Sequence, residues 1–169
     1  NGKDTLALKQ AYALLLTLNR IPQLYYGTEI LMNGTKEVAD GNVRKDFPGG
    51  FAGDTANKFT REGRTAAENA MFDWTARLLH WRKGNDVIVH GKQIQFIPWH
   101  GIYVVTRQYN GRTVMTVING RNTSGKLEVK RYAEIIGNNT IAHDVCTGES
   151  VSLSADVPLK ARQTMVLEF

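Results

Sequence analysis

Two charged side chains four residues apart, Asp40 and Arg44, stand in a stretch of the chain that is otherwise rich in glycine. A carboxylate accepts hydrogen bonds from paired hydroxyl groups, and a guanidinium group donates hydrogen bonds in a fixed fork. The two side chains together suit a site that binds a ligand rich in hydroxyl groups. Without further context, the same spacing is more typical of a surface ion pair in a mobile loop.

Several neighbouring residues could also do chemistry. Glu29 follows the end of a predicted strand, a position that suits an acid or base, and Tyr25 and Tyr26 could stack on a ring. Tyrosines at the end of a buried strand are more typical of a core, so we expect both to be buried. Phe47 and Phe51 flank a Pro-Gly-Gly turn, where packing within the loop is the favoured interpretation.

The cysteine and histidine residues give little support for a disulfide or a metal site. One cysteine, Cys146, cannot form an internal disulfide, so a disulfide-rich fold is excluded. The four histidines have no mutual spacing typical of a zinc site: His80, His90, His100 and His143. We therefore assign no metal.

The amino-acid composition is typical of a folded protein. Of 169 residues, 42% are hydrophobic and 22% are charged, which is unlike a disordered tail. The net charge is +5, but the basic residues are spread from Lys3 to Arg162, so nucleic-acid binding is disfavoured. The longest apolar stretch, around Ala11 to Leu18, is much shorter than the roughly 20 residues that cross a bilayer.

The first half of the chain shows helical and strand signals in turn. Helical spacing and a capping residue predict a helix from Asp4 to Leu18. The apolar run from Arg20 to Tyr26 predicts a buried strand, and the glycine-rich segment from Gly27 to Thr60 predicts a long functional loop. Thr65 and Glu68 have the capping-box spacing, which predicts a helix ending at Lys83-Gly84.

After about Val87 the hydrophobic period changes to two, which predicts an antiparallel β-sandwich. Asn110-Gly111 predicts a type I′ hairpin turn between two strands within Tyr103 to Asn119. Trp99 lies in a predicted turn, where its ring could be exposed as a stacking platform. Four further short strands are predicted: Leu127 to Tyr132, Thr140 to Val145, Val151 to Ser154 and Gln163 to Phe169.

The predicted strand in the first half lacks a sheet. A lone buried strand would leave its backbone groups unpaired on both edges. We therefore expect residues 1–86 to be the end of a larger α/β domain that begins before Asn1.

One segment, Pro22-Gln-Leu-Tyr-Tyr-Gly27-Thr-Glu29, resembles the eighth barrel strand of the α-amylase family, glycoside hydrolase family thirteen. The resemblance continues through Arg44-Lys-Asp-Phe-Pro-Gly-Gly-Phe51, the helix ending at Leu78-Leu-His-Trp-Arg-Lys-Gly84, and a terminal β domain. The resemblance covers nearly the whole chain. Within the family, the chain is most similar to neopullulanase and cyclomaltodextrinase-type periplasmic enzymes.

The resemblance implies a fold of class α/β plus all-β. Residues 1–86 would be the last helix, strand, loop and helix of a (β/α)8 barrel, and residues 87–169 the family's C-terminal β-sandwich. The chain would be part of a retaining enzyme that hydrolyses α-glucans such as starch, pullulan or maltodextrins. The family's three catalytic carboxylates would precede Asn1, so we expect residues 1–169 to be inactive alone.

The resemblance also assigns residues and partners. Asp40 and Arg44 match an aspartate and an arginine that hold a sugar beside the cleavage site, whereas Glu29 matches a structural residue. No cofactor is expected in residues 1–169, and any calcium is expected to bind elsewhere in the longer protein. Expected partners are an α-glucan or maltooligosaccharide, with no nucleic acid and no membrane span, and the truncated chain is expected to self-associate. The expected location is bacterial, either periplasmic or secreted.

Two alternatives stay open: a non-catalytic carbohydrate-binding module formed by residues 88–169, and a purely structural β-sandwich. Binding modules of this kind typically display two or three coplanar exposed aromatic side chains. Six aromatic residues are available, and most occupy alternating strand positions that favour packing: Phe96, Trp99, Tyr103, Tyr109, Tyr132 and Phe169.

Overall fold

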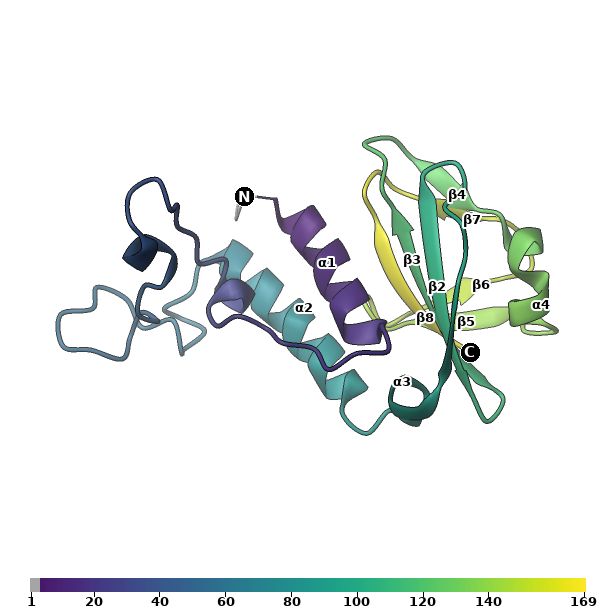
Figure 1. Ribbon diagram of the computed structural model, residues 1–169, viewed down its shortest axis with the longest axis horizontal. Helices are drawn as coiled ribbons and strands as arrows, with labels where there is room; N and C mark the ends of the chain where they lie inside the picture. Colours follow the sequence, from purple (N-terminus) through teal and green to yellow (C-terminus); the bar gives the residue numbers. More distant parts are fainter. Residues whose placement is uncertain (1–3) are drawn as a thin grey trace.

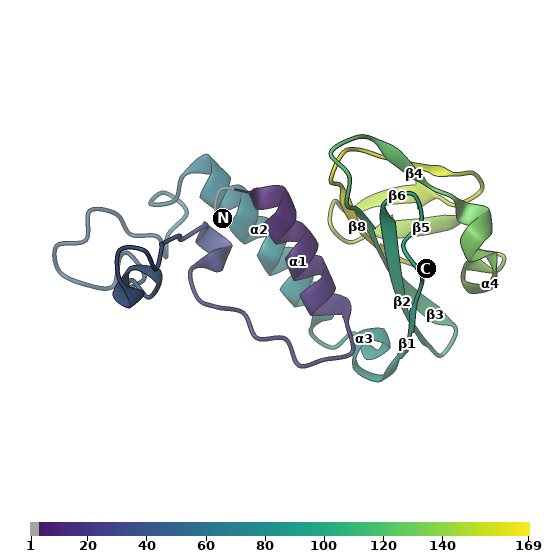
Figure 2. The same cartoon turned by 45° about the horizontal axis from the view of Figure 1, so that its top comes forward.

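Two long helices lie beside a β-sandwich, and a long irregular segment extends from them on the side away from the sandwich (Figure 1). The structure is a computed structural model that describes residues 4–169. Helices α1 (Thr5–Thr17) and α2 (Ala66–Arg82) run side by side (Figures 1 and 2). Between them the chain forms two short 3-10 turns, η1 (Thr28–Ile30) and η2 (Asp40–Val43).

Both long helices begin where the sequence predicts. The Asp4 carboxylate accepts a hydrogen bond from the Ala7 amide at 3.0 Å and so caps α1. At the start of α2 the Thr65 hydroxyl accepts from the Glu68 amide at 3.3 Å, while the Glu68 carboxylate accepts from the Thr65 amide at 2.6 Å. The predicted capping box is therefore confirmed.

The predicted hairpin is also confirmed. Strands β2 (Ile102–Tyr109) and β3 (Arg112–Asn119) pair antiparallel across Asn110 and Gly111, whose φ angles are 48° and 76°. Both angles are positive, as a type I′ turn requires. The hairpin belongs to a six-stranded antiparallel sheet of order β1-β2-β3-β8-β5-β6, faced by a two-stranded sheet of β4 and β7. The remaining strands are β1 (Lys92–Gln95), β4 (Gly125–Leu127), β5 (Ile141–Asp144), β6 (Glu149–Ser152), β7 (Val157–Leu159) and β8 (Thr164–Glu168).

Three parts of the second half differ from the expectation. The predicted strand Leu127 to Tyr132 is wrong beyond Leu127, because the chain continues as η3 (Val129–Tyr132) and the one-turn helix α4 (Ala133–Ile136). Tyr132, Ile135 and Ile136 have helical spacing and are all buried in the sandwich core, so packing favours the helical turns. The strand predicted at 151–154 begins and ends two residues earlier, and a short helix, α3 (Asp86–His90), precedes β1.

The buried strand predicted from Arg20 to Tyr26 is wrong for the described chain. This segment is extended, yet no described strand pairs with it, and Ile21 is 96% exposed. A strand needs a partner for its backbone hydrogen bonds, and the described residues place none beside it. The part of the fold expected to end a barrel is therefore seen here as two helices with an unpaired connection.

The central strands β2, β3 and β8 of the six-stranded sheet are buried on both faces. Met115, Val117 and Leu167 pack with β4, β7 and α4 in the sandwich core. Val114 and Val166 pack instead against the helices, in a second core that includes Leu16 and Leu78. None of the described helices is long and apolar enough to span a membrane.

Polar contacts reinforce the seam between α1 and the sheet. The buried Thr116 hydroxyl donates to the Thr17 hydroxyl at 2.8 Å, and Thr17 donates onward to the Ala13 carbonyl at 2.7 Å. Arg107, 1% exposed, donates to the Thr17 carbonyl at 3.3 Å and twice to the Gly91 carbonyl, at 2.9 and 2.7 Å. Arg107 thus supplies donors to a terminal carbonyl of α1 and to the C-cap carbonyl of α3, where helix carbonyls lack intrahelical donors.

Candidate functional site

The candidate site lies in the segment between η1 and α2, and backbone geometry at Gly27 sets its entry. Gly27 has φ 79°, and a Cβ atom there would collide with the side chain of Met32. Its carbonyl accepts from the amides of Ile30 and Met32, at 3.2 and 2.9 Å, and closes the η1 turn. Glycine is therefore required at the point where the chain leaves the extended segment.

Asp40 and Arg44 lie at the two ends of η2. Asp40 is the first residue of this turn and Arg44 is its C-cap, with the Arg44 amide donating to the Gly41 carbonyl at 3.0 Å. Both residues are exposed. Among the described residues, no ion pair joins the two side chains and neither makes a side-chain hydrogen bond. The surface ion pair considered from the sequence is therefore not formed.

The backbone around η2 is tied to two other parts of the segment. The Asn42 side chain accepts from the Thr35 amide at 2.8 Å, and the Tyr26 hydroxyl donates to the Lys45 carbonyl at 2.8 Å. An open cavity of about 230 Å³ lies between these contacts and is lined by Tyr26, Asn42 and Lys45 among others. Asp40 and Arg44 do not line it; Asn42 and Val43, which lie between them in sequence, do.

The two tyrosines do not form the predicted core. Tyr25 is 55% exposed and Tyr26 is 44% exposed, with their ring centroids 4.8 Å apart. The expectation of burial depended on a strand paired on both sides, and that pairing is missing from the described chain. Their rings are instead available at the surface beside η2.

Glu29 occupies a different environment from Asp40. It is partly buried on η1 and lines an apolar cavity of about 350 Å³ between α1 and α2, together with Tyr12 and Phe72. Burial raises the pKa of the Tyr12 phenol above its ordinary value. The surroundings of Glu29 are those of a packing residue between helices.

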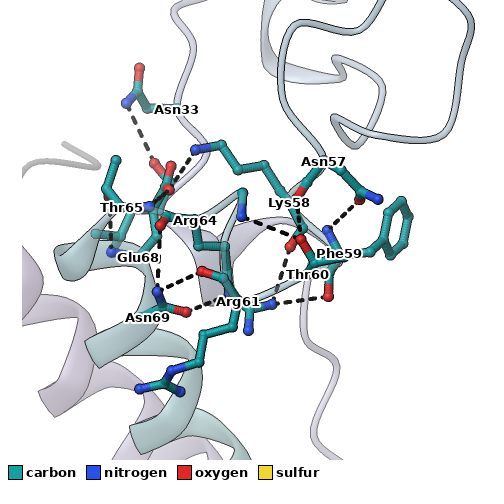
Figure 3. A network of polar contacts seen from close by, with 12 residues as sticks. Asn33, Asn57, Lys58, Phe59, Thr60, Arg61, Arg64, Thr65, Glu68 and Asn69 are labelled. Carbon is teal, nitrogen blue, oxygen red and sulfur yellow. Dashed lines mark hydrogen bonds and ion pairs between the residues drawn. The ribbon is translucent and has the colours of Figure 1, made fainter.

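The far end of the segment is anchored to α2 by a polar network (Figure 3). Lys58 donates to the Glu68 carboxylate at 2.7 Å, and Arg64 donates to the Asn69 side chain at 2.8 Å and to the Lys58 carbonyl at 3.1 Å. Burial alone would raise the pKa of Glu68, but the Lys58 ammonium and the Thr65 hydrogen bonds outweigh it and lower that pKa. The capping pair was visible in the sequence; Lys58 was not, because nothing local signals its approach to Glu68.

A second carboxylate, that of Asp54, accepts hydrogen bonds from backbone amides of the same loop. Asp54 accepts from the Gly49 amide at 2.6 Å and from the Phe51 amide at 3.0 Å. The amides of Phe51 and Gly49 lower the pKa of Asp54. Phe47 packs against Phe59 with ring centroids 4.5 Å apart, as expected for loop packing, whereas Phe51 is 64% exposed.

The tryptophans and the cysteine differ in how far they are buried. Trp74 and Trp81 pack against the helix–sheet core, while Trp99 is 42% exposed. Cys146 is buried, and burial raises the pKa of its thiol. Within residues 4–169 no three His, Cys, Asp or Glu side chains gather as a metal site would require.

Comparison with known proteins shows where this arrangement recurs. Residues 93–168 match the family "Cyclo-malto-dextrinase C-terminal domain". The chain is 25% identical over 160 residues to an α-amylase of Niallia circulans, covering 89% of the chain and 26% of that protein. It is 24% identical over 165 residues to a cyclomaltodextrin glucanotransferase of Thermoanaerobacterium thermosulfurigenes, covering 92% of the chain and 20% of that protein.

Solved structures show the same fold. An Anoxybacillus α-amylase superposes with a TM-score of 0.72 at 18% identity, over 97% of the chain and 32% of that structure. An α-amylase from Geobacillus thermoleovorans, complexed with acarbose, superposes with a TM-score of 0.69 at 22% identity, over 96% of the chain and 33% of that structure. The chain thus spans about a fifth to a quarter of the length of the curated relatives that it matches. The resemblance to the α-amylase family is confirmed, and residues 93–168 match the cyclo-malto-dextrinase C-terminal domain.

Proposed function

We propose that the chain is the C-terminal part of a longer retaining α-glucan hydrolase of the neopullulanase type. Residues 1–86 end its (β/α)8 barrel, and residues 87–169 form the β-sandwich that follows. The observation that carries the proposal is the segment from Ile21 to Leu24, which pairs with no strand among the described residues and whose Leu24 lines the apolar groove between α1 and α2. A neighbouring barrel strand would pair with this segment and cover the groove.

The proposal gives Asp40 and Arg44 a role in substrate binding. Loops at the carboxyl ends of barrel strands build the active site, and the segment that carries η2 follows the proposed eighth strand. Both side chains are exposed and free of partners among the described residues, so each is available to a sugar. The three catalytic carboxylates are proposed to lie in the preceding part of the longer protein, with any calcium, and the protein is proposed to act in the periplasm or outside the cell.

Substitution of Arg44 in the longer protein tests the subsite. Arg44→Ala should lower kcat/KM roughly ten- to hundred-fold, because hydrogen bonds to a charged group contribute about 1.5 to 3 kcal/mol. Long maltooligosaccharides should suffer most, and substrates too short to reach the subsite should be nearly unaffected. Arg61→Ala is the matched control, because Arg61 is an exposed arginine of the same segment that pairs with Asp73. Equal losses on short and long substrates would refute the assignment.

The isolated chain provides two further tests. It should release no reducing sugar from pullulan, starch or cyclodextrins, and turnover by residues 1–169 alone would contradict the placement of the carboxylates. It should also self-associate, because Ile21, Tyr25 and Leu79 expose apolar surface that a complete barrel would cover. Sedimentation velocity that shows a monomer at all concentrations would count against the missing barrel neighbour.

A further inference from the structure

The position of the 3-10 turn η2 depends on contacts within the long connection between η1 and α2, here called the η2 segment. Figures 1 and 2 show this turn, in dark blue, apart from both α1 and α2. Asp40 and Arg44, at its two ends, make no side-chain hydrogen bond or ion pair among the described residues. The backbone of η2 therefore sets where both side chains stand.

Asn42 joins η2 to the chain that precedes it. Its side-chain Oδ1 accepts a hydrogen bond from the Thr35 backbone amide at 2.8 Å, and within residues 4–169 its Nδ2 makes no hydrogen bond. Asn42 is also half-buried, whereas Asp40 and Arg44 are exposed. The accepting oxygen is thus the atom through which this side chain holds residue 35 against the turn.

The two stretches of backbone also touch at Gly34. A Cβ atom at this position would collide with the backbone carbonyl of Asn42 and would lie 2.9 Å from Asn42 Oδ1. The first of these obstacles is backbone and cannot rotate away as a flexible side chain could. Any side chain at position 34 would therefore have to push η2 outward.

Lys45 makes the contacts on the other side of the turn. Its carbonyl accepts from the Tyr26 hydroxyl at 2.8 Å, and its ammonium group donates to the Asn33 carbonyl at 3.4 Å. The hydrogen bond made by Asn42 to residue 35 is shorter than the one made by the Lys45 ammonium to residue 33. It also comes from within η2 itself, between Asp40 and Arg44 in the sequence.

We propose that Asn42 is a positioning residue: by holding residues 34 and 35 against η2, it fixes how Asp40 and Arg44 meet a maltooligosaccharide. This role rests on the subsite that the proposed function assigns to those two side chains. Asn42 acts through them and does not itself touch the sugar. A turn that is already held in place loses less conformational entropy on binding, so its release should weaken binding even though the sugar-binding side chains are intact.

Hydrogen exchange of the Thr35 amide, measured by NMR on residues 1–169 without sugar, tests the contact itself. Asn42→Ala should speed this exchange roughly two- to tenfold, the effect of losing one hydrogen bond. Asn42→Asp keeps the accepting oxygen and should exchange as the wild type does. Asn57→Ala is the matched control, because Asn57 Oδ1 accepts from the Phe59 amide at 3.0 Å, a bond of the same kind that does not involve η2.

Kinetics of the longer protein test the consequence for substrate. Asn42→Ala should raise KM for long maltooligosaccharides roughly two- to tenfold and leave kcat nearly unchanged, because the subsite binds ground state and transition state alike. Gly34→Ala, which removes no polar group, should give the same pattern, and Asn42→Asp should keep the wild-type KM. A variant that is merely less well folded would lower the apparent kcat instead.

A double-variant background shows whether Asn42 acts through the subsite. When Asp40 and Arg44 are both replaced by alanine, Asn42→Ala should cause no further rise in KM. A rise that persists in this background overturns the positioning role. A loss in Asn42→Asp equal to that in Asn42→Ala also overturns it, because the side chain would then contact the sugar through Nδ2.

Failure of the inference and failure of the proposed function give different results. An unchanged Thr35 exchange rate in Asn42→Ala, together with a large loss in Arg44→Ala, refutes the positioning role and leaves the subsite in place. Arg44→Ala without effect on long substrates refutes the subsite itself, and the positioning role with it.

Discussion

The contact between Thr17 on α1 and Thr116 on β3 allows a direct test of how the helices are attached to the sheet. Thr17→Val keeps the shape of the side chain but removes the only described partner of the buried Thr116 hydroxyl. A buried hydroxyl without a partner costs about 1–3 kcal/mol. At about 2–4 °C per kcal/mol for a chain of this size, the melting temperature should fall by about 2–12 °C.

The reciprocal variant should cost less. In Thr116→Val the Thr17 hydroxyl still donates to the Ala13 carbonyl, so only the net value of one hydrogen bond is lost, about 0.5–1.5 kcal/mol. In the double variant no hydroxyl is left unsatisfied. Its cost should therefore be smaller than the sum of the two single costs, by a coupling of at least about 0.5 kcal/mol.

Urea and thermal unfolding, followed by circular dichroism, measure all four proteins of this cycle. Thr140→Val, which changes an exposed threonine just before β5, is the control and should leave stability almost unchanged. Strictly additive costs, or a Thr17→Val variant as stable as the wild type, would refute the reasoning, because either result means that α1 is not docked on the sheet through this pair.

Two further predictions concern the ends of the η2 segment. Because the folded pKa of Glu68 lies below its ordinary value of 4.5, the stability that this residue contributes should be present above that pH and be lost as the pH falls through the folded pKa. Melting temperatures of the wild type and Glu68→Gln should therefore converge as the pH is lowered through that range. A difference that persists unchanged at lower pH would contradict the Lys58–Glu68 assignment. In limited proteolysis, the segment 27–60 should be cut before residues 88–169, which form a closed sandwich with its own core. First cleavage within the β2–β3 hairpin would contradict this order.

Local signals in the sequence were sufficient for the elements whose ends depend on near neighbours. The Asp4 cap, the Thr65–Glu68 capping box and the Asn110-Gly111 turn all involve residues within three positions of one another, so the pattern itself specifies the geometry. The same reasoning anticipated the packing of most sandwich aromatics and the exposure of Trp99. The family resemblance likewise depended on short contiguous segments.

Other features depended on residues far apart in the chain. The run from Arg20 to Tyr26 has the composition of a buried strand, but strand formation needs a partner that the described residues do not supply, so Tyr25 and Tyr26 remain exposed. The helical turns at 129–136 form because Tyr132 and its neighbours fill the end of the sandwich core.

The same holds for the polar contacts that organise the site and the seam. Asp40 and Arg44 could be chosen from residue type and resemblance, but that they stand apart and unpaired at the two ends of a 3-10 turn is a property of the folded segment. Thr17 and Thr116 are 99 positions apart, and Arg107 reaches the end of α1 only when the sheet docks there. Thr17, Thr116 and Arg107 are buried, and a buried polar group needs a hydrogen-bond partner because it has lost its contact with water. That partner is whichever complementary atom the fold brings within reach.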